Sequence, residues 1–268
     1  ARWIPRAVDM FCILNDTFRI AMLMEEDQAA QVSDKPEDES VKAQRKEVLS
    51  LICEDSQEWH MRNFTKILAG APYLRKLAYG SVKQQSKLLD VLTEMQGIMS
   101  QVRSDDTSHL KTCIGQYAAP RPTDEGLSPT IFTDNKSRAK LGVNHPQLAA
   151  LLCPIKHVKA FHEDPKKYNA VIKMQTAAWP AFAYAGDPPG TDFDPDNVQE
   201  GFLQGYYLKH VFCHIFTSPS SALLPDGDAN TIHSGNAKLH GMEKVEAEHI
   251  AYAFIQVRAA IEFIYTTI

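Results

Sequence analysis

Apolar residues in the first 117 positions recur at steps of three and four, which is the period of an amphipathic α-helix. This spacing predicts helices over residues 5–24, 38–69 and 81–102, followed by a short helix that ends at Tyr117. Residues 104–107 would cap the start of that short helix, because serine, threonine and aspartate side chains accept hydrogen bonds from free backbone N–H groups. The apolar positions that define the longer helices are Val8, Phe11, Leu14, Phe18, Met22, Leu49, Ile52, Phe64, Ile67, Leu68, Leu88, Leu89, Leu92, Met95, Met99 and Val102.

The second half of the chain continues this helical pattern. Short helices are predicted at about 146–153, 155–163 and 165–173, and two longer ones at 198–217 and 245–267. The last helix carries an apolar seam at four-three-four-three spacing, which predicts packing against another helix of this chain or of a partner. The seam residues are Ile250, Phe254, Val257, Ile261 and Ile264. Because no segment alternates cleanly between apolar and polar residues, we expect an all-α fold: an irregular multi-helix bundle with long loops and little or no β-sheet.

Proline and glycine punctuate a long stretch at residues 118–143, which is the best candidate boundary within the chain. We expect one helical domain over residues 1–268, made of an N-terminal helical half (1–117), this loop, and a C-terminal helical core (144–268). Two acidic segments, 25–39 and 185–197, are expected to be solvated loops.

Composition narrows the class of protein. The 268 residues are 44% hydrophobic and 23% charged, as in ordinary globular domains. The formal charge of −5 argues against a dedicated nucleic-acid coat protein. The chain has neither an apolar run long enough to span a membrane nor the pattern of a signal peptide at its start. Its five cysteines form no Cys-x-x-Cys pair, so we expect a reducing, intracellular location, in the cytoplasm or the nucleus.

Two histidines one turn apart, His210 and His214, lie in the apolar segment 198–217. Side chains at this spacing share a helix face and could bind one metal ion, with His240 as a third ligand. No glutamate follows His210, so the zinc-protease motif is excluded. The alternative, which we favour, is that both histidines are hydrogen-bonded within the core, since the helix is apolar on nearly all sides.

Other candidate metal-binding motifs are better explained by structural roles, namely the stabilisation of a helix N-terminus or of turns. The single Glu246-x-x-His249 step is only part of a di-iron pattern, and its glutamates suit a helix N-terminus. The aspartates at 192–196 and 226–230 lack the glycine and glutamate of a calcium loop, and are expected to form turns. No phosphate-binding glycine loop and no nucleophile elbow is found, so no motif requires a cofactor.

Positive charge gathers between residues 135 and 173, where eight lysines and arginines face only two acidic residues. Side chains of this segment could contact phosphates or an acidic partner. They could equally be neutralised by the flanking acidic loops, which is the interpretation we favour. The residues concerned are Lys136, Arg138, Lys140, Lys156, Lys159, Lys166 and Lys167, together with Lys173.

A series of short motifs, in this order, resembles an uncharacterised domain family that is abundant in mushroom-forming fungi. The motifs are Trp3-Ile-Pro, Arg103-Ser-Asp-Asp-Thr-Ser108, Asn144-His-Pro-Gln147, Leu152-Cys-Pro154, Trp179-Pro-Ala-Phe182, Asp194-Pro-Asp196, Gly201-Phe-Leu-Gln-Gly205, Ile215-Phe-Thr-Ser-Pro-Ser-Ser-Ala222, Lys238-Leu-His-Gly-Met242, Ile250-Ala-Tyr252 and Arg258. The resemblance covers nearly the whole chain. It implies a fungal, intracellular protein of a domain of unknown function, and it supplies no catalytic residue.

These observations favour an interaction module over an enzyme. We expect the chain to bind a protein or a nucleic-acid backbone, with a homodimer through the seam of the last helix as one form of protein partner. No membrane partner is expected. The alternative is an enzyme or a protein that binds a small ligand or metal, with a pocket lined by His214, Tyr207, His240 and Trp179.

Overall fold

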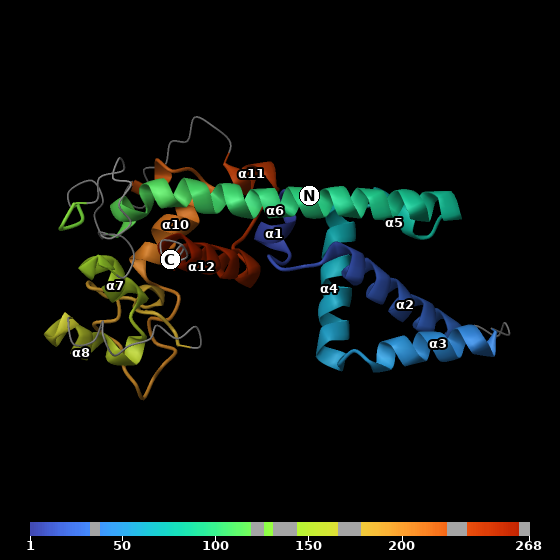
Figure 1. The fold of residues 1–268 in the computed structure, drawn as a ribbon, viewed down its shortest axis with the longest axis horizontal. Helices are drawn as coiled ribbons and strands as arrows, with labels where there is room; N and C mark the ends of the chain where they lie inside the picture. Colours follow the sequence, from blue (N-terminus) through green and yellow to red (C-terminus); the bar gives the residue numbers. More distant parts are fainter. Residues whose placement is uncertain (33–37, 119–125, 131–143, 166–177, 224–234, 263–268) are drawn as a thin grey trace. The chain divides into compact units, whose positions relative to one another are not determined.

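The computed structural model describes residues 1–32, 38–118, 126–130, 144–165, 178–223 and 235–262. Within these ranges the chain is helical, and β-structure is limited to two isolated bridges, Pro154 with Pro180 and Tyr184 with Phe202. The expectation of an all-α fold is therefore confirmed (Figure 1). No helix in the described ranges is both long enough and apolar enough to cross a membrane.

The chain divides into two compact units, Ala1–Arg103 and Ser104–Ile268, and the division lies inside one long helix. The sequence had suggested residues 118–143 as the boundary instead. That all 268 residues form one domain stays a prediction.

The first unit is built from six helices of the described residues (Figure 1). They are α1 (Ile4–Ala7), α2 (Leu14–Val32), α3 (Glu39–Ser50), α4 (Glu54–Gly70), α5 (Tyr73–Ala78) and the first part of α6 (Val82–Tyr117). The core of this unit lies where α2 packs on α4, and there the rings of Phe18 and Phe64 meet edge to face at 5.0 Å. Apolar side chains of α1, α2, α4, α5 and α6 supply the rest of this core, on the faces that periodicity predicted for the longer helices.

The helix predicted over residues 5–24 is interrupted. α1 ends at Ala7 and α2 begins at Leu14, because the segment between them is held by side-chain hydrogen bonds. The carboxylate of Asp9 accepts the backbone N–H of Phe11 at 2.7 Å and the indole N–H of Trp59 at 2.9 Å. An aspartate that binds the backbone two residues ahead favours a turn over a helix.

Two further boundaries in this unit differ from expectation. Residues 25–32, predicted as an acidic loop, continue α2 to Val32. Residues 38–69 form two helices, because Cys53 adopts an extended conformation as the N-cap of α4. Both corrections concern positions where the apolar pattern is weak, so periodicity alone did not locate the helix end.

The helix α6 runs without a break from Val82 to Tyr117, so the predicted stop and new start at residues 104–107 is wrong. Asp106 and Thr107 bind residues of the last helix rather than capping a helix of their own. The Asp106 carboxylate accepts the hydroxyl of Tyr252, and the Thr107 hydroxyl donates to the Gln256 amide oxygen, both at 2.7 Å. The side chains of Asp106 and Thr107, which were expected to cap a helix N-terminus, thus form tertiary hydrogen bonds with α12 instead.

The described residues of the second unit continue with short helices around a central pair (Figure 1). They are α7 (Pro146–Leu152), η3 (Ile155–His157), α8 (Val158–Glu163), η4 (Ala181–Ala183), α10 (Tyr206–Phe216), η5 (Ser221–Leu223), α11 (Asn236–Leu239) and α12 (Ala247–Glu262). α10 and α12 are in contact and form the centre of this unit. Most of the helix predicted at 165–173 lies outside the described residues.

The predicted helix 198–217 begins only at Tyr206, because the backbone of the preceding residues turns sharply. Gly201 and Leu203 have positive φ angles of 71° and 61°, which a right-handed helix does not allow. Gly205 then passes so close to η4 that a Cβ atom there would lie 2.0 Å from the Phe182 carbonyl oxygen. Gly205 therefore serves close packing against η4, whereas Gly201 serves the turn of the backbone.

Candidate functional site

The histidines of α10 both contact Tyr117, the last residue of α6. Nδ1 of His214 shares a 2.7 Å hydrogen bond with the Tyr117 hydroxyl. Nδ1 of His210 donates to the Tyr117 carbonyl oxygen at 3.3 Å. Each imidazole thus uses one ring nitrogen to attach α10 to the end of α6, and this arrangement agrees with the hydrogen-bonded interpretation of the two histidines.

Burial controls the protonation of this cluster. It lowers the pKa of His214 below its usual value; the nearby Asp106 partly opposes the shift, and His109 adds to it. Burial raises the pKa of Tyr117, so the phenol is protonated at neutral pH. A neutral imidazole beside a neutral phenol is suited to a hydrogen bond within the protein interior.

The metal site predicted at His210, His214 and His240 gains no support. Within the described ranges, no group of three or more His, Cys, Asp or Glu side chains is placed to hold a metal ion. His240 is the C-cap residue of α11. The metal site stays a prediction.

The two aromatic residues predicted to line a ligand pocket lie in different environments. Tyr207 has no exposed area, and its hydroxyl donates to the Ile114 carbonyl oxygen at 3.3 Å. Trp179 is 54% exposed. Only Trp179 is therefore accessible to a binding partner from outside.

The basic residues predicted to contact phosphates fall largely outside the described ranges. Lys136, Arg138, Lys140, Lys166 and Lys167 are among those not described. Lys156 lies in η3 and Lys159 in α8, and both side chains are exposed. Contact with phosphates or with an acidic partner stays a prediction.

Trp179 lies at the edge of a group of aromatic rings. Its indole meets Phe202 at 4.8 Å and Phe254 at 5.7 Å between ring centroids, both edge to face. Phe202 also packs on Tyr184, whose hydroxyl donates to the Val198 carbonyl oxygen at 3.2 Å. Val198 and Leu203 expose apolar side chains in the same loop. We call Trp179, Val198, Phe202 and Leu203 the Trp179 surface.

The loop that carries most of this surface, residues 185–205, is held closely against the core of its unit. Gly190 has a φ of 80°, and a Cβ atom there would lie 2.4 Å from Cδ1 of Ile155. Phe193 packs edge to face on Tyr184 at 5.2 Å. The Asp194 carboxylate accepts the N–H of Asp196 at 2.9 Å, which confirms the expected aspartate turn.

The sequence pointed to Trp179 but not to Val198, Phe202 or Leu203. The Gly201-Phe-Leu-Gln-Gly205 motif could have indicated Phe202 and Leu203, because glycines on both sides of an apolar pair are typical of a constrained turn. Periodicity had instead assigned these residues to a helix.

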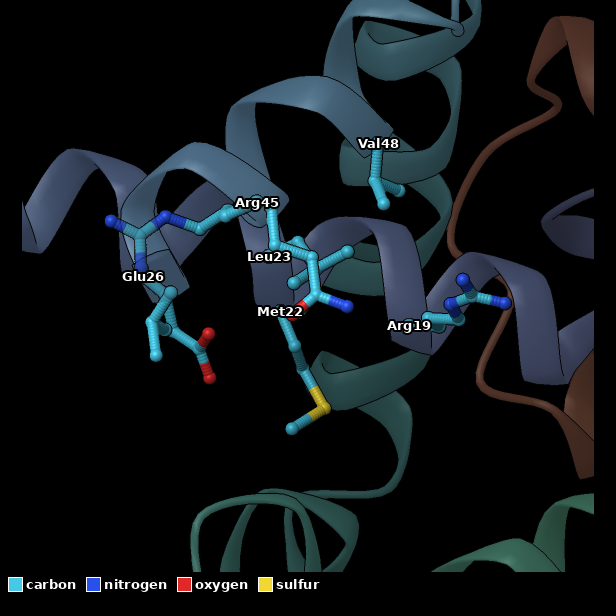
Figure 2. Close-up of a pocket in the computed structure, with 8 residues that line it drawn as sticks. Arg19, Met22, Leu23, Glu26, Arg45 and Val48 are labelled. Atoms are coloured by element: carbon cyan, nitrogen blue, oxygen red, sulfur yellow. The ribbon is translucent and has the colours of Figure 1, made fainter. Parts of the chain in front are cut away.

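A separate pocket lies in the first unit, between α2 and α3, with a volume of about 390 Å³ (Figure 2). Half of its lining is apolar and half is polar. The lining residues are Arg19, Met22, Leu23, Glu26, Val41, Gln44, Arg45 and Val48. The volume is at the lower end of the range for small-molecule sites.

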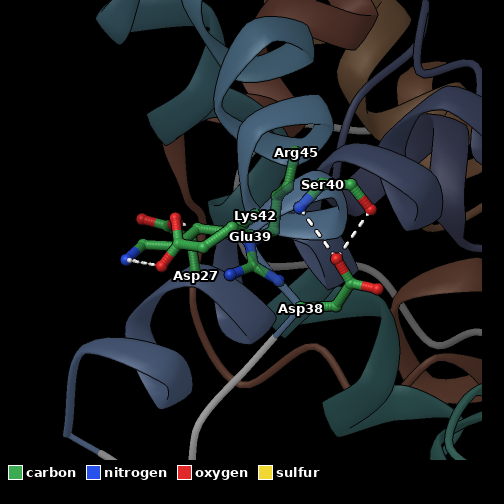
Figure 3. A network of polar contacts seen from close by, with 6 residues as sticks. All are labelled: Asp27, Asp38, Glu39, Ser40, Lys42 and Arg45. Atoms are coloured by element: carbon green, nitrogen blue, oxygen red, sulfur yellow. Dashed lines mark hydrogen bonds and ion pairs between the residues drawn. The ribbon is translucent and has the colours of Figure 1, made fainter.

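Arg45 is the only buried residue of the described part of α3, and it anchors this helix to α2. Its Nε atom forms an ion pair with Oδ1 of Asp27 at 3.3 Å (Figure 3). Asp38 caps α3 by accepting the N–H of Ser40 at 2.9 Å. Because the Arg45 charge is matched by Asp27, this pocket offers no isolated buried cation for an anionic ligand.

Comparison with known proteins gives one positive result. The model of DUF6698, a family of unknown function, matches residues 97–262. No curated protein and no solved structure matched the chain. The matched residues include the His210–Tyr117–His214 contacts and the Trp179 surface, whereas the α2–α3 pocket lies before them. The match confirms the expected uncharacterised domain, and the expected fungal distribution stays a prediction. The chain belongs to DUF6698, a family of unknown function.

Proposed function

We propose that this chain is an interaction module that binds a protein partner through the Trp179 surface. The observation that carries the proposal is the exposure of Trp179, a large ring more than half of which contacts solvent. Tryptophan is enriched among the residues that contribute most to binding between proteins. Trp179 packs on Phe202, and the loop that carries Phe202 also exposes Val198 and Leu203; exposed apolar patches are typical of interaction sites.

The loop that carries Phe202 and Leu203 supports the same proposal because its backbone is already constrained. Leu203 has a positive φ, a conformation that costs free energy in a residue with a side chain. The Tyr184–Val198 hydrogen bond and the packing of Gly190 hold the loop around it. A surface ordered before binding loses less conformational entropy when a partner arrives.

The other candidate functions have weaker support. A ligand pocket around His214, Tyr207 and His240 would need Tyr207 to be accessible, and this side chain is fully buried. A homodimer through the seam of α12 would need Val257 and Ile261, which are buried within the chain itself. Binding of a nucleic-acid backbone depends on the basic segment 136–173, of which the described residues include few side chains.

The proposal is tested by selecting peptides from a random displayed library on the immobilised full chain. Each enriched peptide is then measured on the Trp179→Ala and Leu239→Ala variants. Leu239 is a matched control, because it is also exposed and apolar but lies on α11. We expect Trp179→Ala to weaken binding at least about thirtyfold, as for an interface residue of high importance. Equal binding by both variants, or no peptide that depends on Trp179, would overturn the proposal.

A further inference from the structure

The loop around the Trp179 surface is acidic throughout. Between residues 185 and 205 the chain has five carboxylates and neither a lysine nor an arginine. All five are exposed, and no ion pair to any of them is found among the residues described. They are Asp187, Asp192, Asp194, Asp196 and Glu200.

The carboxylates and the Trp179 surface belong to one ordered structure. Asp192 and Asp194 flank Phe193, whose ring packs on Tyr184. Tyr184 in turn packs on Phe202, which meets the Trp179 indole. The backbone bonds of the loop, including Ala185 N–H to the Gly201 carbonyl oxygen at 2.9 Å, close it at its base. The carboxylates thus lie in the same ordered loop as Val198, Phe202 and Leu203, and this loop packs on Trp179 through Phe202.

We infer that the partner is a polypeptide segment with one apolar or aromatic side chain flanked by lysines or arginines. This inference rests on the proposed function and names the chemistry of its partner. The apolar side chain would pack on Trp179 and Leu203, while the flanking cations would face the five carboxylates. Opposite charges around an apolar contact speed encounter and exclude partners of the wrong sign.

The same charges disfavour a nucleic-acid backbone at this surface, because phosphates and carboxylates repel each other. A lysine or arginine above the indole face would also be attracted by the negative face of the ring. The aromatic residue and the acidic residues therefore favour the same class of partner.

The peptide selection on the immobilised chain also tests this inference. The quantity that decides it is the charge of those peptides whose binding is weakened by Trp179→Ala. An excess of lysine and arginine beside an apolar residue supports it. Peptides that depend on Trp179 but are neutral or acidic overturn the inference and leave the proposed function intact. If no peptide depends on Trp179, both are overturned.

A triple variant separates local charge from overall charge. Asp192→Asn, Asp194→Asn and Asp196→Asn remove three loop charges, and asparagine at 194 keeps an oxygen that can accept the N–H of Asp196. The control variant carries Glu47→Gln, Glu58→Gln and Glu94→Gln, three exposed positions of the first unit, and changes the net charge equally.

For a selected basic peptide, measured by fluorescence anisotropy at low salt, we expect the loop variant to bind about tenfold more weakly. The control variant should bind like the unmodified chain. Equal weakening in both variants would show that only net charge matters, and would overturn the inference.

A second copy of the chain is the competing occupant. Light scattering over a range of protein concentrations detects it as a dimer that Trp179→Ala abolishes. That result would overturn the inferred basic peptide partner, whereas a monomer at all concentrations, together with binding of the basic peptide, supports it.

Discussion

The hydroxyl of Tyr252 on α12 donates a 2.7 Å hydrogen bond to the carboxylate of Asp106 in the last third of α6. Both side chains are buried, and 146 positions of sequence separate them. The bond joins the long helix to the last helix within the second unit, and the Thr107–Gln256 bond repeats this connection one position further along α6 and one turn further along α12. These polar contacts specify how α6 and α12 align, which apolar packing alone leaves less defined.

Removal of the Tyr252 hydroxyl should therefore destabilise the protein. We expect Tyr252→Phe to lower the free energy of unfolding by about 1.5–3 kcal/mol, since the buried carboxyl group loses a hydrogen bond. Urea denaturation measures the change. Tyr73→Phe is the control, because Tyr73 is exposed; its effect should stay within about 0.5 kcal/mol. Equal effects at the two positions would contradict the proposed role of the Asp106–Tyr252 bond.

The pKa of His214 predicts a dependence of stability on pH. Burial lowers this pKa in the folded protein, whereas in the unfolded chain the imidazole titrates near its usual value of about 6.5. The unfolded chain therefore binds the proton first as pH falls. The stabilisation is complete above about pH 6.5 and is lost as pH falls from there towards the folded-state pKa.

His214→Gln isolates this contribution, because glutamine does not titrate and can still bond the Tyr117 hydroxyl. We expect the free energy of unfolding of the unmodified chain to fall more steeply than that of the variant between about pH 7 and 5. The difference between the two curves is the relevant quantity, since His60 also has a lowered pKa. Parallel curves would show that His214 does not contribute.

Asn63 on α4 is fully buried, and neither the nitrogen nor the oxygen of its amide has a hydrogen-bond partner among the described residues. A buried polar group without partners costs about 1–3 kcal/mol. We expect Asn63→Leu, which keeps a similar volume, to leave the stability unchanged or raise it by up to that amount. Thermal unfolding followed by circular dichroism tests this prediction. A clear loss of stability would mean that the amide has an important partner in solution.

Two glycines provide a matched pair. A Cβ atom at Gly205 would lie 2.0 Å from the Phe182 carbonyl oxygen, whereas at Gly97 it would meet, beyond the backbone of its own helix, no atom of the described residues within 4 Å. Gly205→Ala should therefore cost about 1–3 kcal/mol through overpacking. Gly97→Ala, within α6, should stabilise the protein by about 0.5–1 kcal/mol, because alanine favours the helix. Denaturant titrations of the two variants should move in opposite directions, and a shift in the same direction would contradict the close approach of Gly205 to η4.

Periodicity located the main helices correctly, because an amphipathic helix shows its buried face in the local sequence. The apolar positions of α2, α4 and α12 are buried largely as expected, with Phe18, Phe64 and Val257 among them. Two of the errors fall where a side chain makes a contact distant in sequence. Asp9 ends α1 through Trp59, and Asp106 continues α6 through Tyr252. No local pattern contains such a partner.

The sequence by itself determined the helical class and the acidity of residues 185–197, since both depend on residue type and local spacing, and the resemblance of its motifs implied an uncharacterised family. Only the tertiary structure decided which candidate side chains are accessible. Tyr207 and Trp179 were equal candidates in the sequence, yet one is fully buried and the other is largely exposed. The physical reason is that exposure depends on what the rest of the chain packs against a residue, and the packing of η4, α10 and α12 becomes known only when the chain has folded.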